Sequence, residues 1–387
     1  MGSKKATWLV IFAPLSVMLL VWAIQLLYYE VFGNSIFNPV SLETWGVVSL
    51  GVFGFTIGAL SVSIFAGGTP AISSPDQGRG FGGFKFVCFS LALFVIVNNL
   101  LLPVFSGVSV SELRNQALED WTAGGIGPRI NAVLLNGLCC FIILIISRIY
   151  EQNKKVSFFW IVLFAILCVA CFARTLLLIG MSIILLRVLL QGKNPIRMIV
   201  LSLLGFVMVF MVLAWLMKDD ASGDESLEQV LIHHLQIYFF GGISGLNHYV
   251  MENTPSYNSI LTVPRFLQFL LPGELEFPPS FYDFVETPGT LNVFTSMYPP
   301  YHDFGLVGVA LFFLFYGACS TVACILFVKT NKAVWQTIAG FLIYATTMTI
   351  FDDQFLRGLP VLLIFVFFAV IFDWLRYAFF DRAQYAE

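Results

Sequence analysis

The sequence predicts an all-α polytopic membrane protein with about ten transmembrane helices, because three properties point to a lipid environment. Of its 387 residues, 58% are hydrophobic and only 11% are charged, whereas soluble domains carry about 25% charged residues. The mean hydropathy is +0.87. Apolar runs of bilayer-spanning length recur along the chain. We therefore expect one integral membrane domain covering residues 1–387.

A span needs about 20 predominantly apolar residues, and ten stretches approach or exceed this length. They are 7–28, 45–66, 84–105, 130–147, 156–173, 175–190, 196–217, 304–328, 334–350 and 359–380. No small-residue cleavage site follows the first stretch, so we expect a retained helix rather than a signal peptide. The fifth and sixth share one apolar run, which predicts a tight helical hairpin with Arg174 at its tip.

The basic residues predict the orientation, since cytoplasmic loops carry an excess of Lys and Arg. With a cytoplasmic N-terminus, fourteen of the 20 basic and five of the 23 acidic residues lie inside, a net charge of +9. The outer side then carries −12, and both sides together give the −3 of the whole chain. Both termini are predicted to be cytoplasmic. The outer basic residues are Arg114, Arg129, Arg174, Lys218, Arg265 and Arg357.

One large outer loop is predicted over residues 218–303. Apolar residues recur at helical spacing within 225–251, which predicts a helix that Gly241, Gly242 and Gly245 weaken or bend. Eight of the 16 prolines fall between 255 and 300, so that stretch is expected to be mostly irregular. Pro264 is suited to start a short interfacial helix from Arg265.

Five of the six outer basic residues are arginines, which favours fixed, multidentate binding of an anion such as phosphate or diphosphate. The alternative is that each arginine pairs with a neighbouring carboxylate, for example Glu119, Glu274 or Asp353. The loop around Arg174 is too short to supply such a partner, so we assign Arg174 to anion binding.

The most polar membrane boundary is residues 292–308, NVFTSMYPPYHDFGLVG. A histidine can take or give a proton near neutral pH, so His302 and Asp303 at a helix start are suited to deprotonate a sugar hydroxyl. The alternative role of Asp303 is an ordinary helix cap. Aromatic side chains expected against sugar rings are Tyr298, Tyr301, Tyr282 and Trp121.

No metal site is expected. His233 and His234 are sequence neighbours and do not share a helix face. The seven cysteines all fall inside apolar runs, as small buried hydrophobes do. Adjacent acids at helix ends are expected to be solvated rather than to bind a cation, namely Asp219–Asp220 and Asp352–Asp353.

Two motifs stand out in this architecture. One is an arginine at the tip of a helical hairpin, here Ala173-Arg174-Thr175. The other is an Asn-x-Phe-Thr…Tyr-x-Asp-Phe-Gly-x-x-Gly run entering the next span. In this chain it comprises Asn292, Phe294, Thr295, Tyr301, Asp303, Phe304, Gly305 and Gly308. With these motifs the chain resembles the O-antigen polymerase (Wzy) family of oligosaccharide repeat-unit polymerases.

The resemblance implies a fold similar to the glycosyltransferase-C class, with the large loop and the active site on the periplasmic face of the bacterial inner membrane. It implies that undecaprenyl-diphosphate-linked repeat units are polymerised without a metal, cofactor or nucleotide sugar. Expected partners are these lipid-linked oligosaccharides, the lipid bilayer and a chain-length regulator protein; no nucleic acid is expected. Some family members carry paired Arg-x10-Gly loops. Arg114 and Gly125 have this spacing, but Arg265 is followed at that distance by Glu276, so the pair is incomplete.

The resulting hypothesis assigns catalysis to Asp303, His302, Arg174 and Arg265, with the arginines holding the departing diphosphate. A base near His302 and Asp303 activates the acceptor hydroxyl, and Glu30 or Glu43 in the first outer loop is a rival base. Expected substrate-binding residues are Arg114, Arg129, Arg357, Asn292, Tyr298, Tyr301 and His248.

Two other functions are compatible with the sequence. An O-antigen ligase has the same chemistry with a different acceptor. A lipid-linked oligosaccharide flippase or secondary transporter belongs to a different class, and usually shows internal repeats and midplane charges. Here the spans are nearly free of charge and the polar residues gather in one outer loop, which favours the polymerase.

Overall fold

The computed structural model describes residues 2–33, 37–64, 82–109, 112–113, 116, 126–151, 158–171, 174–191, 227–252, 260–270, 282, 284–287 and 289–378. Within these residues the chain is a helical membrane protein. Seven helices are long and apolar enough to cross a membrane: Ala13–Val31, Leu42–Ile64, Gly82–Phe105, Ile130–Glu151, Tyr298–Thr330, Ala333–Ile350 and Leu359–Arg376. The polytopic all-α class predicted from the sequence is therefore confirmed.

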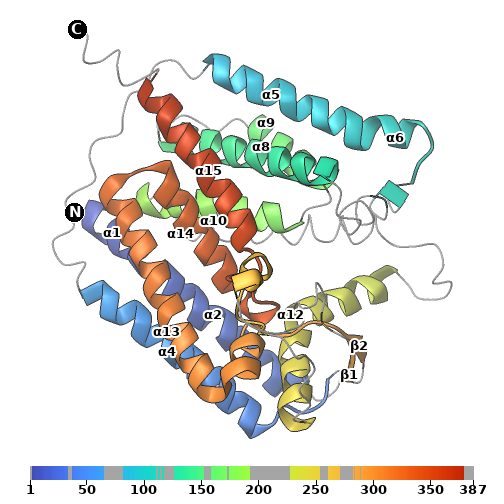
Figure 1. Cartoon of the computed structure of the whole chain (residues 1–387), viewed down its shortest axis with the longest axis vertical. Coiled ribbons are helices and arrows are strands. Elements are labelled where there is room, and N and C mark those ends of the chain that lie inside the picture. The colour runs from blue at the N-terminus through green and yellow to red at the C-terminus, as the bar shows by residue number, and fades with distance from the viewer. Residues whose placement is uncertain are drawn as a thin grey trace.

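The first half of the chain contributes helices to most of the bundle (Figure 1). These elements are α1 (Gly2–Ile11), α2 (Ala13–Tyr28), η1 (Tyr29–Gly33), α4 (Leu42–Ile64), α5 (Gly82–Ile96), η2 (Val97–Leu101), α6 (Leu102–Phe105), α8 (Ile126–Glu151), α9 (Phe158–Ala170) and α10 (Arg174–Gln191). The predicted first span is divided at Phe12, where Pro14 occupies the first turn of α2.

The second half adds α12 (Leu227–Glu252), η3 (Arg265–Leu270), β1 (Val285–Thr287), β2 (Gly289–Leu291), α13 (Tyr298–Thr330), α14 (Ala333–Thr347), η4 (Met348–Ile350) and α15 (Leu359–Arg376). The strands β1 and β2 form a small antiparallel hairpin within the stretch predicted to be irregular. The predicted helix over 225–251 and the short helix from Arg265 are both present.

Nine of the ten predicted spans fall on described helices, and the span over 196–217 lies outside the described residues. The predicted hairpin over 156–190 is present as α9 and α10, and Arg174 is the first residue of α10. The described apolar parts of these two helices are only Phe159–Ala170 and Thr175–Gln191. They pack against each other and against α8.

The closest helix pair is α4 with α13, whose backbones meet at small residues. A Cβ at Gly58 would overlap the carbonyl oxygen of Leu314, and a Cβ at Gly317 would overlap that of Phe55. Small residues at such crossings let membrane helices approach closely, so that backbone atoms pack without hindrance from side chains. The span that carries the 292–308 motif is therefore held firmly by α4.

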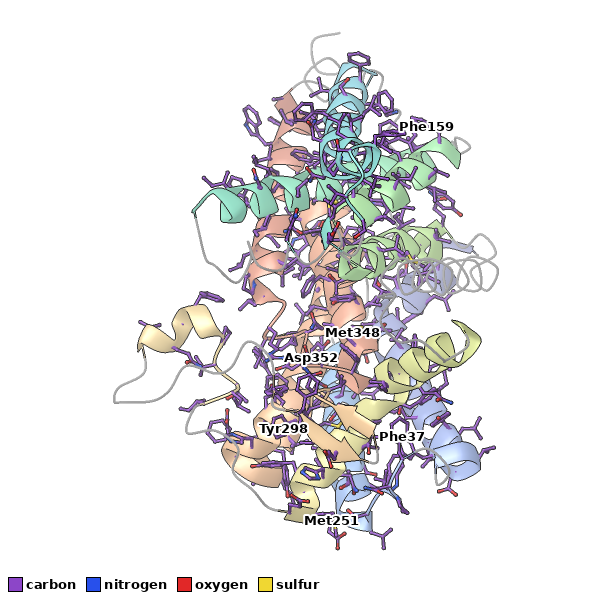
Figure 2. The ribbon with its side chains drawn as sticks, turned by 90° about the vertical axis from the view of Figure 1, so that its right-hand side faces the viewer. Phe37, Phe159, Met251, Tyr298, Met348 and Asp352 are labelled. Carbon is purple, nitrogen blue, oxygen red and sulfur yellow. The ribbon has the colours of Figure 1, made fainter. Side chains whose placement is uncertain are left out.

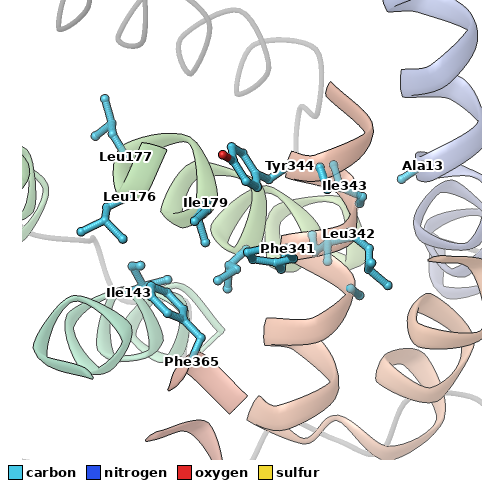
Figure 3. Packing of buried hydrophobic residues seen from close by; sticks show 14 of the residues in the cluster. Ala13, Ile143, Leu176, Leu177, Ile179, Phe341, Leu342, Ile343, Tyr344 and Phe365 are labelled. Carbon is cyan, nitrogen blue, oxygen red and sulfur yellow. The ribbon is translucent and has the colours of Figure 1, made fainter. Parts of the chain in front are cut away.

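Helix α14 lies at the centre of the bundle and contacts α2, α10, α13 and α15. Its Phe341, Leu342, Ile343 and Tyr344 are buried among Ile143, Leu176, Ile179 and Phe365 of the surrounding helices (Figure 3). The apolar side chains on the outer faces of α2, α5 and α13 remain exposed, as surfaces that lipid covers do.

A buried ionic network joins three helices at the end to which the charge distribution assigns the cytoplasmic side. Arg187 is 2% exposed and donates to Glu151 Oε1 at 3.2 Å and to Gln336 Oε1 at 2.7 Å. Asn331 donates to Glu151 at 2.8 Å, and Arg148 pairs with the same carboxylate. Removing one partner of such a network leaves an uncompensated buried charge, so it fixes how α8, α10 and α14 are aligned.

Helix α12 runs from Leu227 to Glu252 without a break, and Figure 1 shows that it changes direction along its length, as expected from the glycines within it. The glycines also allow close packing. A Cβ at Gly242 would overlap the carbonyl oxygen of Ile350, and one at Gly245 would overlap that of Val293. The helix therefore lies directly on the end of α14 and on the segment leading into α13.

Candidate functional site

The charge distribution places three connections on the outer side: the segment before α4, the large loop, and the segment that follows α14. In the structure these three connections lie together. Asn247 of α12 accepts hydrogen bonds from Ser41 N at 2.8 Å and from Thr44 Oγ1 at 3.0 Å, which ties the large loop to the start of α4. Ser296 N donates to Thr349 O at 2.9 Å, which ties the segment 292–297 to the end of α14. Figure 2 shows Phe37, Met251, Tyr298 and Asp352 in one half of the molecule and Phe159 in the other.

The polar motif of residues 292–308 forms a helical turn before the span itself. Helix α13 begins at Tyr298, six residues earlier than predicted, and is interrupted at Gly305 with φ 60° and ψ −149°. This backbone region is essentially restricted to glycine. The interruption separates the turn that carries His302 and Asp303 from the membrane-spanning part of α13.

We expect Gly305→Ala to destabilise the protein by about 1–3 kcal/mol, because alanine is strained in this conformation. A Cβ at Gly305 would have no atom within 4 Å, so the cost arises from the backbone and not from a clash. The measurement is thermal unfolding of the purified protein in detergent. Gly83→Ala in α5 is the matched control, since its Cβ also meets nothing within 4 Å and its backbone is helical; equal stability of the two variants would contradict the strain argument.

The carboxylate of Asp303 is fully occupied by hydrogen bonds. Its Oδ1 accepts from Leu261 N at 3.0 Å, and its Oδ2 accepts from Thr262 N at 2.7 Å and from Thr262 Oγ1 at 2.6 Å. His302 Nδ1 lies 2.8 Å from Oδ1, and the Asp303 side chain is 2% exposed. The alternative that Asp303 caps its own helix is wrong, since it instead fastens a loop 41 residues away.

The contact with Asp303 determines the orientation of His302. A carboxylate only accepts hydrogen bonds, so Nδ1 carries the proton and Nε2 is the basic ring nitrogen. The imidazole lies 5.9 Å from the rings of both Tyr249 and Tyr298 and its side chain is 7% exposed. This is the geometry of a histidine that a carboxylate holds in one tautomer.

Tyr298 is the centre of an aromatic cluster. Its ring centroid lies 4.5 Å from that of Phe294, 4.8 Å from that of Tyr249 and 5.1 Å from that of Tyr282. Tyr298 is 0% exposed. It therefore supports the wall beside His302 rather than presenting its face to a sugar, which corrects its predicted role. Tyr301 packs on Tyr249 at 6.1 Å and is partly exposed.

At the far edge of this cluster, Arg357 joins the 351–358 turn to Tyr282. Its guanidinium lies 4.2 Å from the centroid of the Tyr282 ring and pairs with Asp352 at 3.2 Å. Arg357 thus has a carboxylate partner, as the alternative interpretation of the outer arginines expected, although the partner is Asp352 rather than Asp353. The expectation that both acids are solvated is wrong for Asp353, which is 1% exposed.

The arginines expected to hold a diphosphate can be placed by their backbones. Arg174 is the first residue of α10, nine residues before Ile183, which lies against Gly340 of α14. Arg265 opens η3, three residues after Thr262. The side chains of Arg174, Arg265 and Arg129 lie outside the described residues, as does the whole of Arg114.

Other predicted residues lie around this centre. Asn292 directly follows β2, and His248 Nε2 lies 3.2 Å from Glu252 Oε2 on the exposed side of α12. The rival bases Glu30 and Glu43 are exposed. Outside the described structure lie Trp121, Asp219–Asp220 and the side chains of His233 and His234.

Sequence reasoning missed the two residues that complete the surroundings of His302. Tyr249 lies among the apolar residues at helical spacing within 225–251, and that spacing predicts only the helix. Thr262 has no local signal, because its importance comes from a contact with Asp303 that sequence spacing does not reveal.

The site is therefore a histidine–carboxylate pair beside a buried aromatic cluster and an ion-paired arginine. Within the part of the chain that the structure describes, no three His, Cys, Asp or Glu side chains form a group that could hold a metal ion. No protein-family model, curated protein or solved structure matches this chain.

Proposed function

We propose that this protein polymerises undecaprenyl-diphosphate-linked oligosaccharide repeat units, as a glycosyltransferase of the inner membrane that acts at the periplasmic face. The observation that carries the proposal is the His302–Asp303 pair at the outer end of the bundle, next to the segment opened by Arg265. The proposal includes ten spans, cytoplasmic termini and the large periplasmic loop derived from the charge distribution.

In the proposed reaction, an acceptor hydroxyl approaches Nε2 of His302. The hydroxyl oxygen attacks the anomeric carbon of the donor glycan, and its proton passes to Nε2. The bond between that carbon and the diphosphate oxygen breaks, and the electron pair leaves with undecaprenyl diphosphate. The imidazolium that forms is stabilised by the carboxylate of Asp303, as in other histidine–carboxylate pairs.

The leaving diphosphate accumulates negative charge as the bond breaks, and arginine guanidinium groups are suited to hold it. Arg174, the first residue of α10, and Arg265, the first residue of η3, are the proposed ligands. Asp303 links Arg265 to the base, because the same carboxylate that orients His302 anchors the backbone of Thr262. Asp303 is therefore proposed as a positioning residue and His302 as the base.

A lipid-linked substrate requires apolar surface beside this chemistry. After the interruption at Gly305, α13 carries exposed apolar side chains at helical spacing: Val307 (67% exposed), Leu311 (62%) and Phe315 (58%). Phe304 (60%), which directly follows Asp303, is also exposed. Membrane lipid covers such a face in any membrane protein. Here it also starts beside the proposed base, so a polyprenyl tail lying along it would bring its diphosphate to the outer end.

The proposal is tested with purified protein and an undecaprenyl-diphosphate-linked repeat unit, incubated with and without a chelator. We expect glycan elongation in both samples, with undecaprenyl diphosphate released at each step. Transfer only to a lipid A core acceptor would instead assign the ligase activity. Translocation of the unit across vesicles without new glycosidic bonds would assign the flippase or transporter function.

A further inference from the structure

The turn between η4 and α15, residues 351–358, contains two adjacent carboxylates in opposite surroundings. The Asp352 side chain is 17% exposed and fully satisfied. It accepts from Arg357 Nη1 at 3.2 Å, from Gln354 Nε2 at 2.9 Å and from Asp353 N at 2.8 Å. Asp353 is 1% exposed. The two acids therefore differ sharply in their access to water and to cations.

Only one oxygen of Asp353 has partners. Its Oδ1 accepts from the backbone amides of Phe355 and Leu356, both at 3.2 Å. Its Oδ2 is buried and has no hydrogen-bond partner among the described residues. A buried carboxylate oxygen without a partner is costly when charged, whereas a protonated carboxyl carries no charge.

Among the described residues, the charged and titratable groups around Asp353 include one cation, Arg357, which already pairs with Asp352. Asp352 and Arg357 of the same turn neutralise one another. The described groups of other elements that interact electrostatically with Asp353 are the phenols of Tyr282, before β1, and Tyr316 of α13. Tyr344 of α14 faces the same turn and donates to Gln354 at 3.0 Å. An ionised Asp353 would leave this set with one excess negative charge.

We propose that this turn is a proton-binding site, in which Asp353 holds a proton on Oδ2 and loss of that proton draws Arg357 from Asp352 and Tyr282 toward Asp353. Burial and the neighbouring Asp352 raise the pKa of Asp353 to about 7, so that the proton is exchanged near neutral pH. The bound proton keeps Arg357 on the Tyr282 ring.

Loss of the proton would also affect side chains outside the turn. Tyr282 packs on Tyr298 at 5.1 Å, and Tyr298 packs near His302 at 5.9 Å. Movement of Arg357 away from Tyr282 would loosen the edge of the aromatic cluster that supports His302. The pH on the outer side would then determine the fraction of molecules in which the aromatic cluster around Tyr298 is ordered.

The direction of the effect on stability follows from the raised pKa of Asp353. Between the ordinary aspartate pKa of 3.8 and about 7, the folded chain keeps a proton that the unfolded chain has lost. Stability therefore falls as pH rises through this interval and reaches a constant lower level above about pH 7.

The test measures the melting temperature of the purified full chain in detergent from pH 5 to pH 9, which does not depend on the proposed enzymatic function. Asp353→Asn keeps the shape of the neutral side chain and is expected to melt several degrees above wild type at pH 9. The difference should shrink steadily as the pH is lowered from 7 toward 3.8, so at pH 5 it should be clearly smaller than at pH 9. Wild type should also show an infrared band of a protonated carboxyl that is absent from Asp353→Asn and disappears on raising the pH.

Two further variants distinguish proton binding from a purely structural role. Asp352→Asn removes the neighbouring negative charge, so the midpoint of the Asp353 transition should move to lower pH. Arg357→Gln removes the compensating cation, so the midpoint should move to higher pH. A wild-type melting curve with the same pH dependence as that of Asp353→Asn, or absence of the infrared band, would overturn the proposal.

Discussion

Replacing His302 with alanine is expected to lower the rate of glycan polymerisation by about 10²–10⁴-fold, the usual contribution of a positioned general base. The physical reason is that Nε2 is the proposed acceptor of the hydroxyl proton, and Asp303 holds Nδ1 at 2.8 Å so that no other tautomer forms. The measurement is elongation of a lipid-linked repeat unit by purified protein. In cells, the same variant should accumulate single repeat units.

The matched control is His233→Ala, which removes a histidine of the same outer loop to which no role is assigned. It should elongate glycan at nearly the wild-type rate. Asp303→Asn should also lose activity, because an amide nitrogen cannot accept the hydrogen bonds of Thr262 or of the imidazole. If His302→Ala retained full elongation while remaining folded, His302 could not be the base, and the exposed Glu30 and Glu43 would become the candidates.

Gly58→Ala is expected to produce the largest loss of stability among single methyl additions to α4. The new Cβ would overlap the backbone carbonyl of Leu314, which has no rotamer by which to move away. Overpacking of this kind costs about 1–3 kcal/mol or more. Separation of α4 from α13 would also displace the turn that carries His302, so activity should fall with stability. Thermal unfolding in detergent and the elongation assay measure the two effects.

Gly46→Ala provides the control on the same helix. A Cβ at Gly46 would meet nothing within 4 Å, and alanine is favoured over glycine in a helix by about 1 kcal/mol. This variant should therefore be as stable as wild type or slightly more stable. If Gly58→Ala were as stable as Gly46→Ala, the close approach of α4 and α13 described above would be wrong.

The helices of the bundle were largely predictable from the sequence. Apolar length predicted α4, α8, α13, α14 and α15, because the free energy of transferring a span to lipid depends on its own residues. The hairpin of α9 and α10 followed from one apolar run interrupted at Arg174. Apolar spacing also predicted α12, but sequence alone does not show that the backbones of Ile350 and Val293 lie against its glycines.

The candidate site was predictable in its location but not in its chemistry. The crowding of His302, Asp303, Tyr298 and Tyr301 at one membrane boundary drew attention to the stretch around which the candidate site is described. The role of Asp303 could not be assigned, because its partners Leu261 and Thr262 precede it by about 40 residues in a proline-rich loop.

By itself, the sequence determined the membrane class, the helical segments and the predicted sidedness, because these depend on hydrophobicity and charge summed over local stretches. Only the tertiary structure decided which polar groups meet. Among the described residues, Asp303 accepts hydrogen bonds from Thr262, Oδ2 of Asp353 has no hydrogen-bond partner, and Arg357 pairs with Asp352. Hydrogen bonds and burial depend on positions in space, and for these residues packing between distant segments sets those positions.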